Sequence, residues 1–107
     1  MAENTLTAPR GIQGNAWAAA VVGANGTSNP VDTFAMPFVT AFGNASAATT
    51  ITLQVSADGV TWYDSQVNQV LAGAGDFCLI ATVAARLVRL KTLSAATITA
   101  SILAKGA

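Results

Sequence analysis

The side chains that most often carry catalysis or bind metals are scarce in this sequence. The chain of 107 residues has no His, one Cys, five acidic and five basic residues. Without His there is no imidazole for a nucleophile–base pair, a metal site or proton transfer near neutral pH. Ser and Thr are plentiful, but no base is available to activate them, and Cys78 has no His partner. The sequence therefore argues against an enzyme, and we expect no cofactor.

Asp58 and Asp64 are the acids whose spacing allows a carboxylate pair or part of a calcium site. Calcium takes about six to eight oxygen ligands, usually with several carboxylates, whereas this chain has five acids in all. Asp58 precedes Gly59, and an Asp-Gly pair is a strong signal for a tight hairpin turn. Asp76 precedes an apolar run, where we expect it to accept hydrogen bonds from loop amides. The acids are thus predicted to be structural, and we expect no metal site.

Three aromatic residues are candidates for contacts with a partner. Trp62 and Tyr63 are adjacent in a predicted strand, so their side chains should point to opposite faces. We expect Trp62 to fill the core of the hairpin and Tyr63 to face outward. Trp17 is expected either in the core or at a contact. Trp17 and Tyr63 are therefore the candidates for packing on a neighbouring subunit or for stacking on a sugar ring.

The basic residues near the C-terminus form the only basic cluster. Alternation along 86–92 separates Arg86 from Arg89 and Lys91, so the cluster is not one patch. We expect these side chains to pair across a sheet face with acids, namely Asp58, Asp64 or Asp76, rather than to bind phosphate. Cys78 stands in the apolar run 77–83 and is expected to be a small buried residue.

The clearest element signal is the alternation over residues 49–56. Ile51, Leu53 and Val55 alternate with polar residues, which predicts a strand with one buried face. After the Asp58-Gly59 turn, a return strand is predicted over 60–65.

Further strands are predicted by period-two patterns and short apolar runs. In residues 32–42 the apolar side chains recur at period two, and Pro37 places this strand at an edge or a bulge. The remaining predicted strands are 15–22, 77–83, 86–92 and 96–104. Residues 1–14, with Pro9 and two glycines, are predicted to form an extended N-terminal arm, and 15–107 a single domain. About seven or eight short antiparallel strands separated by turns predict an all-β sandwich or barrel.

Part of this pattern resembles a known family. Residues 51–63 carry Val-x-x-Ser-x-Asp-Gly-x-x-Trp-like spacing, and residues 85–90 read Ala-Arg-Leu-Val-Arg-Leu. The two stretches resemble the discoidin-type, galactose-binding-like jelly roll, in which a Tyr occupies the position of Leu87. That resemblance implies a jelly-roll-like sandwich in which Gly59 makes the turn and Trp62 fills the core. The chain is shorter than typical members and lacks their terminal cysteines. The ligand-binding loops of that family are not matched, so no sugar-binding or lipid-binding residue is carried over.

The hairpin, with the terminal Thr- and Ile-rich strand, is also similar to small phage virion proteins. These include head decoration proteins and tail-associated β-sandwich modules. The resemblance implies a structural protein of a virion, with the major capsid protein as a partner.

Composition points to a surface that is covered by neighbours. Charged residues make up 9% of the chain and the net charge is zero, whereas about 25% is usual. Nucleic-acid binding is disfavoured because it needs clustered Lys and Arg. The longest apolar run, 16–22, is too short to span a membrane, and residues 1–11 lack the basic and apolar regions of a secretory signal. Because interface cores are depleted in charge, the composition favours assembly over a free neutral β domain.

The sequence therefore predicts a non-enzymatic structural subunit of a larger assembly, most plausibly a phage capsid decoration protein. It is expected to be made in the host cytoplasm and used in the virion, as a homo-oligomer or bound to other virion proteins. The alternative is a glycan-binding adhesion module in which Trp17 or Tyr63 stacks on a sugar.

Overall fold

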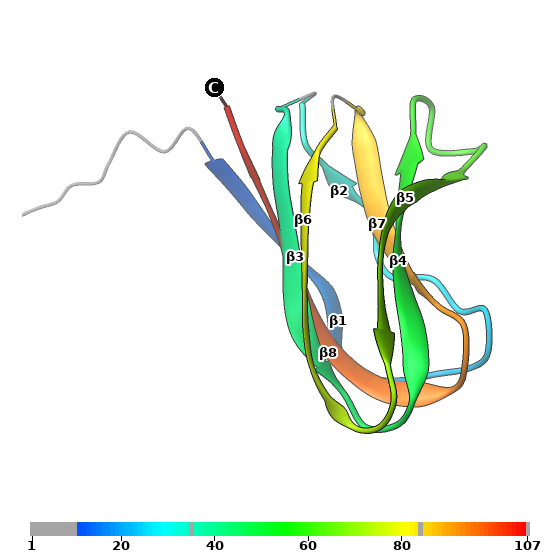
Figure 1. The fold of residues 1–107 in the computed structure, drawn as a ribbon. Coiled ribbons are helices and arrows are strands. Elements are labelled where there is room, and N and C mark those ends of the chain that lie inside the picture. Colours follow the sequence, from blue (N-terminus) through cyan, green and yellow to red (C-terminus); the bar gives the residue numbers. More distant parts are fainter. Residues whose placement is uncertain (1–10, 35, 84, 107) are drawn as a thin grey trace, which may run out of the picture.

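The computed structural model describes residues 11–34, 36–83 and 85–106, and within them the chain forms eight strands and no helix. Two four-stranded antiparallel sheets pack face to face as a sandwich (Figure 1). Sheet 1 contains, in spatial order, β1 (Gly11–Val22), β8 (Ala96–Lys105), β3 (Phe38–Ala45) and β6 (Gly75–Thr82). Sheet 2 contains β2 (Val31–Asp32), β7 (Leu87–Thr92), β4 (Thr49–Ser56) and β5 (Tyr63–Leu71). None of the described residues belongs to a helix of the length and apolarity that a membrane crossing needs.

The strand order is that of a jelly roll. Consecutive strands lie in opposite sheets except β4 and β5, so most connections cross from one sheet to the other. An eight-stranded double sheet of this kind buries one face of each sheet against the other. The predicted all-β, jelly-roll-like sandwich of seven or eight antiparallel strands is confirmed.

The core follows the alternation that the sequence displays most clearly. In β8 every second residue from Ala96 to Ala104 is buried, while Thr97 and Thr99 face outward. In β4, Ile51 and Leu53 are fully buried against the opposite sheet. Burying an aliphatic side chain of this size contributes roughly 1.5–3 kcal/mol, so these strands anchor the sandwich.

The strand predicted over 32–42 is divided and lies elsewhere than expected. β2 ends at Asp32, and β3 begins at Phe38, directly after Pro37, which has no N–H to donate to a ladder. β3 is an interior strand between β8 and β6, so the expected edge position is wrong. Of the period-two apolar side chains that predicted it, Phe34, Phe38 and Phe42 are exposed and Met36 packs against the core, to which Val39 belongs.

The return strand of the hairpin starts later and runs further than predicted. Residues 57–62 form a loop, and β5 runs from Tyr63 to Leu71 rather than over 60–65. The pairing of β4 with β5 shifts between Thr52 and Gln54, so residues 65–67 stand opposite Leu53 alone. The turn residues Asp58 and Gly59 do lie in the loop, and Gly59 has a φ of 80°, which favours glycine.

Cys78 is exposed, and its predicted burial is wrong. In β6, Phe77, Leu79 and Ala81 face the core, whereas Cys78 and Ile80 face outward. A run that is apolar on both faces does not reveal which face is covered. The register with β3 and the sandwich geometry settle it.

Gly11–Gly14 form the start of β1 and pair with the end of β8. These residues of the predicted N-terminal arm therefore belong to the sandwich. Residues 1–10 lie outside the described residues.

Candidate functional site

The outward surface of sheet 1 carries a contiguous set of apolar side chains. Across the sheet, Phe42 on β3 pairs with Cys78 on β6. Thr40, two residues before Phe42, pairs with Ile80 on β6 and with Leu103 on β8. We call this set the apolar face; its members are Phe38, Phe42, Cys78, Ile80 and Leu103. Ile80 is 76% exposed, Phe38 46% and Phe42 42%, so much of their apolar surface meets water.

The outward surface of sheet 2 is mostly polar, with Tyr63 and Val70 of β5 as its exposed large apolar side chains. It carries polar and charged side chains in register, including Gln54 on β4 beside Arg89 on β7 and Asp64 on β5. An antiparallel sheet normally presents a polar face like this one to water. Since the two sheets of one sandwich differ in this way, the apolar face is not a general consequence of the fold. Because soluble domains rarely expose large contiguous apolar patches, the apolar face is the candidate interaction site of this chain.

One charge stands at each of two opposite corners of the apolar face. Asp76 on β6 pairs with Asn44 on β3, whose Nδ2 donates to Asp76 Oδ1 at 2.9 Å. At the other end of the sheet, Lys105 on β8 pairs with Phe38. These are the only charged residues in the four strands of sheet 1. Asp76 was expected to accept from loop amides, and it accepts instead from a side-chain amide across the sheet.

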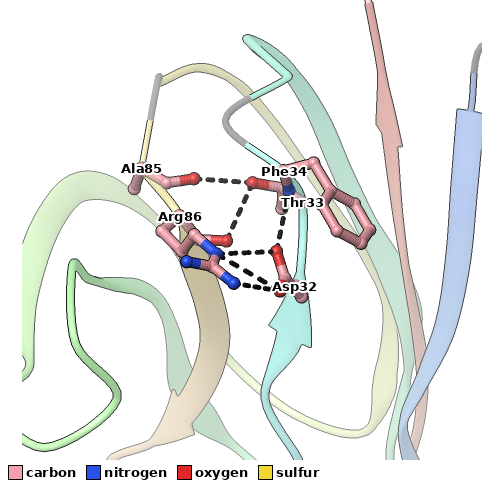
Figure 2. A network of polar contacts seen from close by, with 5 residues as sticks. All are labelled: Asp32, Thr33, Phe34, Ala85 and Arg86. Carbon is pink, nitrogen blue, oxygen red and sulfur yellow. Dashed lines mark hydrogen bonds and ion pairs between the residues drawn. The ribbon is translucent and has the colours of Figure 1, made fainter.

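A single aromatic side chain projects from the loop after β2. Phe34 is 65% exposed and has a φ of 52°, a conformation that costs a bulky residue about 1–3 kcal/mol. Asp32 Oδ1 accepts the Phe34 N–H at 2.9 Å, and Arg86 donates to both Asp32 oxygens at 3.2–3.3 Å. The buried Thr33 hydroxyl donates to the Ala85 carbonyl at 2.6 Å. Figure 2 shows this network, with the Phe34 ring turned away from the Arg86 guanidinium.

The network explains how the strained backbone persists. The Arg86 hydrogen bonds, followed by the one from Phe34, hold the pKa of Asp32 below its usual range, so the carboxylate stays ionised. The start of the loop is thus fixed to Ala85 and Arg86 before β7, and at its end the Pro37 carbonyl accepts the Val83 N–H at 2.9 Å. A fixed, exposed aromatic ring is the kind of side chain that enters a partner's pocket. The sequence pattern gave no signal for Phe34 beyond its place in an apolar period-two run.

Tyr63 lies at a shallow hollow of about 280 Å³ at one end of sheet 2. The hollow is lined by the end of β4, the start of β5 and the segment before β7, namely Val55, Ser56, Ala57, Tyr63, Ala85 and Arg86. Tyr63 is 64% exposed, as the sequence predicted from its outward position. An exposed phenol ring beside a hollow offers one flat surface and one hydroxyl to a ligand.

Trp62 does not fill the core, contrary to expectation. It is half-buried on the outer side of sheet 2, where the Arg89 guanidinium lies 4.1 Å from its ring centroid. Its Nε1 donates to the Gly59 carbonyl at 3.3 Å, which ties the ring to its own loop. A cation–π contact of this kind contributes about 0.5–1 kcal/mol at exposed sites. Trp62 therefore covers a polar row of the sheet instead of packing between the sheets.

The polar row beneath Trp62 is fully connected. Arg89 Nε donates to Gln54 Oε1 at 2.8 Å, and Gln54 Nε2 donates to Asp64 Oδ1 at 2.7 Å. Partial burial lowers the pKa of Arg89 from its ordinary value, but a guanidinium remains a cation at neutral pH.

The expected partners of the basic residues are therefore corrected. Arg86 pairs with Asp32, and Arg89 reaches Asp64 only through Gln54. The register of β4 with its two neighbours sets the second arrangement, because it places Gln54 between Arg89 and Asp64.

Asp58 organises the loop between β4 and β5. Its Oδ1 accepts the N–H groups of Val60 at 2.9 Å and Thr61 at 3.0 Å. These bonds, with the one from Thr61 contributing most, hold the pKa of Asp58 below its usual range. Asp58 thus accepts backbone N–H groups within the loop where the sequence placed the turn. Among the described residues, no three His, Cys, Asp or Glu side chains gather where a metal ion could bind.

Trp17 is buried, with 5% of its surface exposed, and it belongs to the core cluster. The bulges that β1 makes against β8, on either side of Trp17, interrupt the alternation of this strand. Its ring is therefore unavailable for a partner or a sugar, and of the two contact candidates only Tyr63 is accessible.

Comparison with known proteins gives a fold similarity without a sequence family. No family model matches the chain, and no curated protein matches it in sequence. Among solved structures, the SPBc2 prophage-derived protein YomS is similar with a TM-score of 0.65 and 10% identity, over 95% of this chain and 98% of that chain. PirA aligns over 96% of this chain and 99% of that chain, with 14% identity and a TM-score of 0.47. The similarity to YomS establishes that the chain shares its all-β fold with a prophage-derived protein.

Proposed function

We propose that this chain is a non-enzymatic structural subunit of a phage virion, of the capsid decoration kind. It packs against neighbouring subunits through the apolar face of sheet 1. The exposure of Ile80, Phe38 and Phe42 in one register-matched patch carries this proposal. Burying such a patch against a partner removes apolar area from water at about 25 cal/mol per Å².

Two further observations support it. The fold is shared with a prophage-derived protein along almost the whole chain. The low charge content leaves much of the surface without the charged groups that interface cores also lack.

The test is incorporation into particles. When the chain is produced together with the particles of the phage that encodes it, it should be recovered in purified virions. Ile80→Lys places a charge in the apolar face and should strongly reduce recovery. Val70→Lys changes an equally exposed residue on β5 in sheet 2 and should be recovered like the unmodified chain. Absence of the chain from purified virions, or equal recovery of both variants, would contradict the proposal.

The segment before β1 gives a separate test of the expected arm. Residues 1–10 precede β1, an edge strand of the same sheet as the apolar face. We propose that this segment extends the contact onto a neighbouring subunit. Deleting residues 1–10 leaves every described strand in place and should lower incorporation. Unchanged incorporation would show that residues 1–10 do not contribute to the contact with a neighbouring subunit.

A glycan-binding adhesion module is the second candidate. The specific observation in its favour is the exposed Tyr63 ring beside the hollow, together with the discoidin-type resemblance of the hairpin. On a glycan array, the isolated chain should bind sugars, and Tyr63→Ala should remove binding. Val60→Ala, an exposed loop residue outside the hollow, should bind as the unmodified chain does. No binding by the unmodified chain would count against this candidate.

A further inference from the structure

We propose that the apolar face docks on a second copy of this chain, in a two-fold dimer that places Lys105 of each copy over Asp76 of the other. This inference rests on the proposed function, since it names the partner of the same surface. Three observations carry it: the position of the two charges, the neutrality of everything between them and the apolar side chains at the centre.

The two charges lie far apart, at diagonal corners of the apolar face. Lys105 is in register with Phe38, and Asp76 is in register with Asn44, six residues further along β3. At the rise of an antiparallel strand this is roughly 20 Å along the strands. β8 and β6 flank β3 on opposite sides, which adds about two strand spacings, or roughly 10 Å, across the sheet.

Opposite charges at diagonal corners make the face complementary to itself. In a two-fold dimer each contact occurs twice, because residue i meets residue j and j meets i. When the two-fold axis lies in the interface plane and at right angles to the Lys105–Asp76 diagonal, the corners exchange places. Both ion pairs then form in one docking, and the patch centre stacks on its own copy.

The region between the corners contains no further charge that would oppose such docking. Besides Asp76 and Lys105, the four strands of sheet 1 hold no charged residue. The outward side chains near the centre are Phe42, Thr40 and Ile80, with Leu103 beside Thr40. A strongly charged partner could pair with only one charge of each sign on this face. A second copy supplies both matching charges.

Cys78 provides a reporter inside the interface. It is the only cysteine of the chain, it is exposed in the single copy, and it pairs with Phe42 in the apolar face. In the proposed dimer it is covered. Sedimentation velocity on the purified chain should show a species of twice 10.8 kDa as concentration rises. Alkylation of Cys78 by a maleimide should slow over the same concentration range.

Charge reversal tests the arrangement of the two copies. Lys105→Glu and Asp76→Lys should each weaken dimerisation by about tenfold or more, because each change removes both symmetric pairs. The double variant restores opposite charges and should recover the affinity. Lys91→Glu on sheet 2 changes the net charge as Lys105→Glu does and should leave dimerisation unchanged. Thermal melts of the four variants at a concentration where each is monomeric should verify that all remain folded.

The possible results separate this inference from the proposed function. A chain that stays at 10.8 kDa at every concentration, with Cys78 alkylated at one constant rate, overturns the second-copy inference. If that chain is still incorporated into virions through Ile80, the proposed function stands and the partner is another virion protein. Dimerisation that withstands both single reversals overturns the Lys105–Asp76 arrangement. Dimerisation that both reversals weaken and the double variant restores supports it, whether or not virions contain the chain.

Discussion

Asp58 is a residue whose charge maintains a loop conformation. In the 57–62 loop the N–H groups of Val60 and Thr61 do not bond to a neighbouring strand. They donate to the Asp58 carboxylate instead. Ser56 adds to this arrangement, since its Oγ accepts the Gly59 N–H at 2.8 Å. The same loop then places Trp62 over Arg89. One carboxylate thus links the turn signal in the sequence to the packing on sheet 2.

The depressed pKa of Asp58 predicts acid sensitivity. Because the pKa is lower in the folded state than in the unfolded chain, where it is about 3.9, the unfolded state binds the proton first as pH falls. The stabilisation is complete above the unfolded pKa and is lost as pH falls through the folded value. Asp58→Asn keeps an oxygen acceptor but does not titrate, so its Tm should fall less between about pH 5 and about pH 2.

Thermal melts followed by circular dichroism across this pH range give the measurement. The pKa of Asp32 is also lowered, so part of the acid sensitivity should remain in Asp58→Asn. Asp58→Ala, which loses the acceptor, should melt at a lower temperature even at neutral pH. An identical fall of Tm with pH in Asp58→Asn and the unmodified chain would show that this carboxylate plays no such part.

At the scale of elements, β3 depends on a close approach to β8 at Gly43. A Cβ at this position would meet the backbone oxygen of Thr99 and would lie 2.7 Å from the Ala100 Cα. Both contacts are with backbone, so neither can move aside without shifting a strand. The interior strand β3, which carries Phe38 and Phe42, therefore packs closely on β8 because Gly43 has no side chain.

Gly43→Ala should accordingly destabilise the chain by about 3 kcal/mol or more. Gly73→Ala, in the turn between β5 and β6, is the matched control, because a Cβ there meets nothing within 4 Å. It should change stability by less than about 0.5 kcal/mol. Urea denaturation of both variants measures the difference. Equal stabilities for the two would mean that sheet 1 adjusts to the added methyl group.

At the scale of the molecule, the sandwich presents two unlike surfaces. Sheet 2 faces outward with a connected polar row that includes Gln54, Arg89 and Asp64. Sheet 1 faces outward with the apolar face, bordered by Asp76 and Lys105. The proposed function assigns the partner contact to the sheet 1 side of the molecule.

The proposed association through the apolar face would link stability to protein concentration. A partner that binds only the folded state raises the apparent stability by mass action. The Tm of the unmodified chain should therefore rise with protein concentration, and so should that of Val70→Lys. For Ile80→Lys it should stay constant. Differential scanning calorimetry over a concentration series measures this, and a Tm independent of concentration in all three proteins would argue against self-association.

The sequence by itself determined the class of fold and the elements with one polar face. β4 and β8 alternate apolar and polar residues. Since one face of such a strand is polar, the apolar face must be the one that is buried. The Asp58-Gly59 turn was also readable, because its residue types are those that a tight turn needs. The composition, with few charges and no His, was likewise evident from the sequence alone.

Only the tertiary structure decided which face of β3 and β6 is covered. Both faces of these strands carry apolar residues, with Phe42 opposite in direction to Ala41 and Ile80 to Leu79. A period of two shows which residues of a strand share a face. When both faces carry apolar residues, it does not show which of the two faces is buried. The core takes the smaller residues of β3, Val39 and Ala41, and leaves Phe38 and Phe42 outside. The apolar face exists for that reason, and it is the surface on which the proposed function depends.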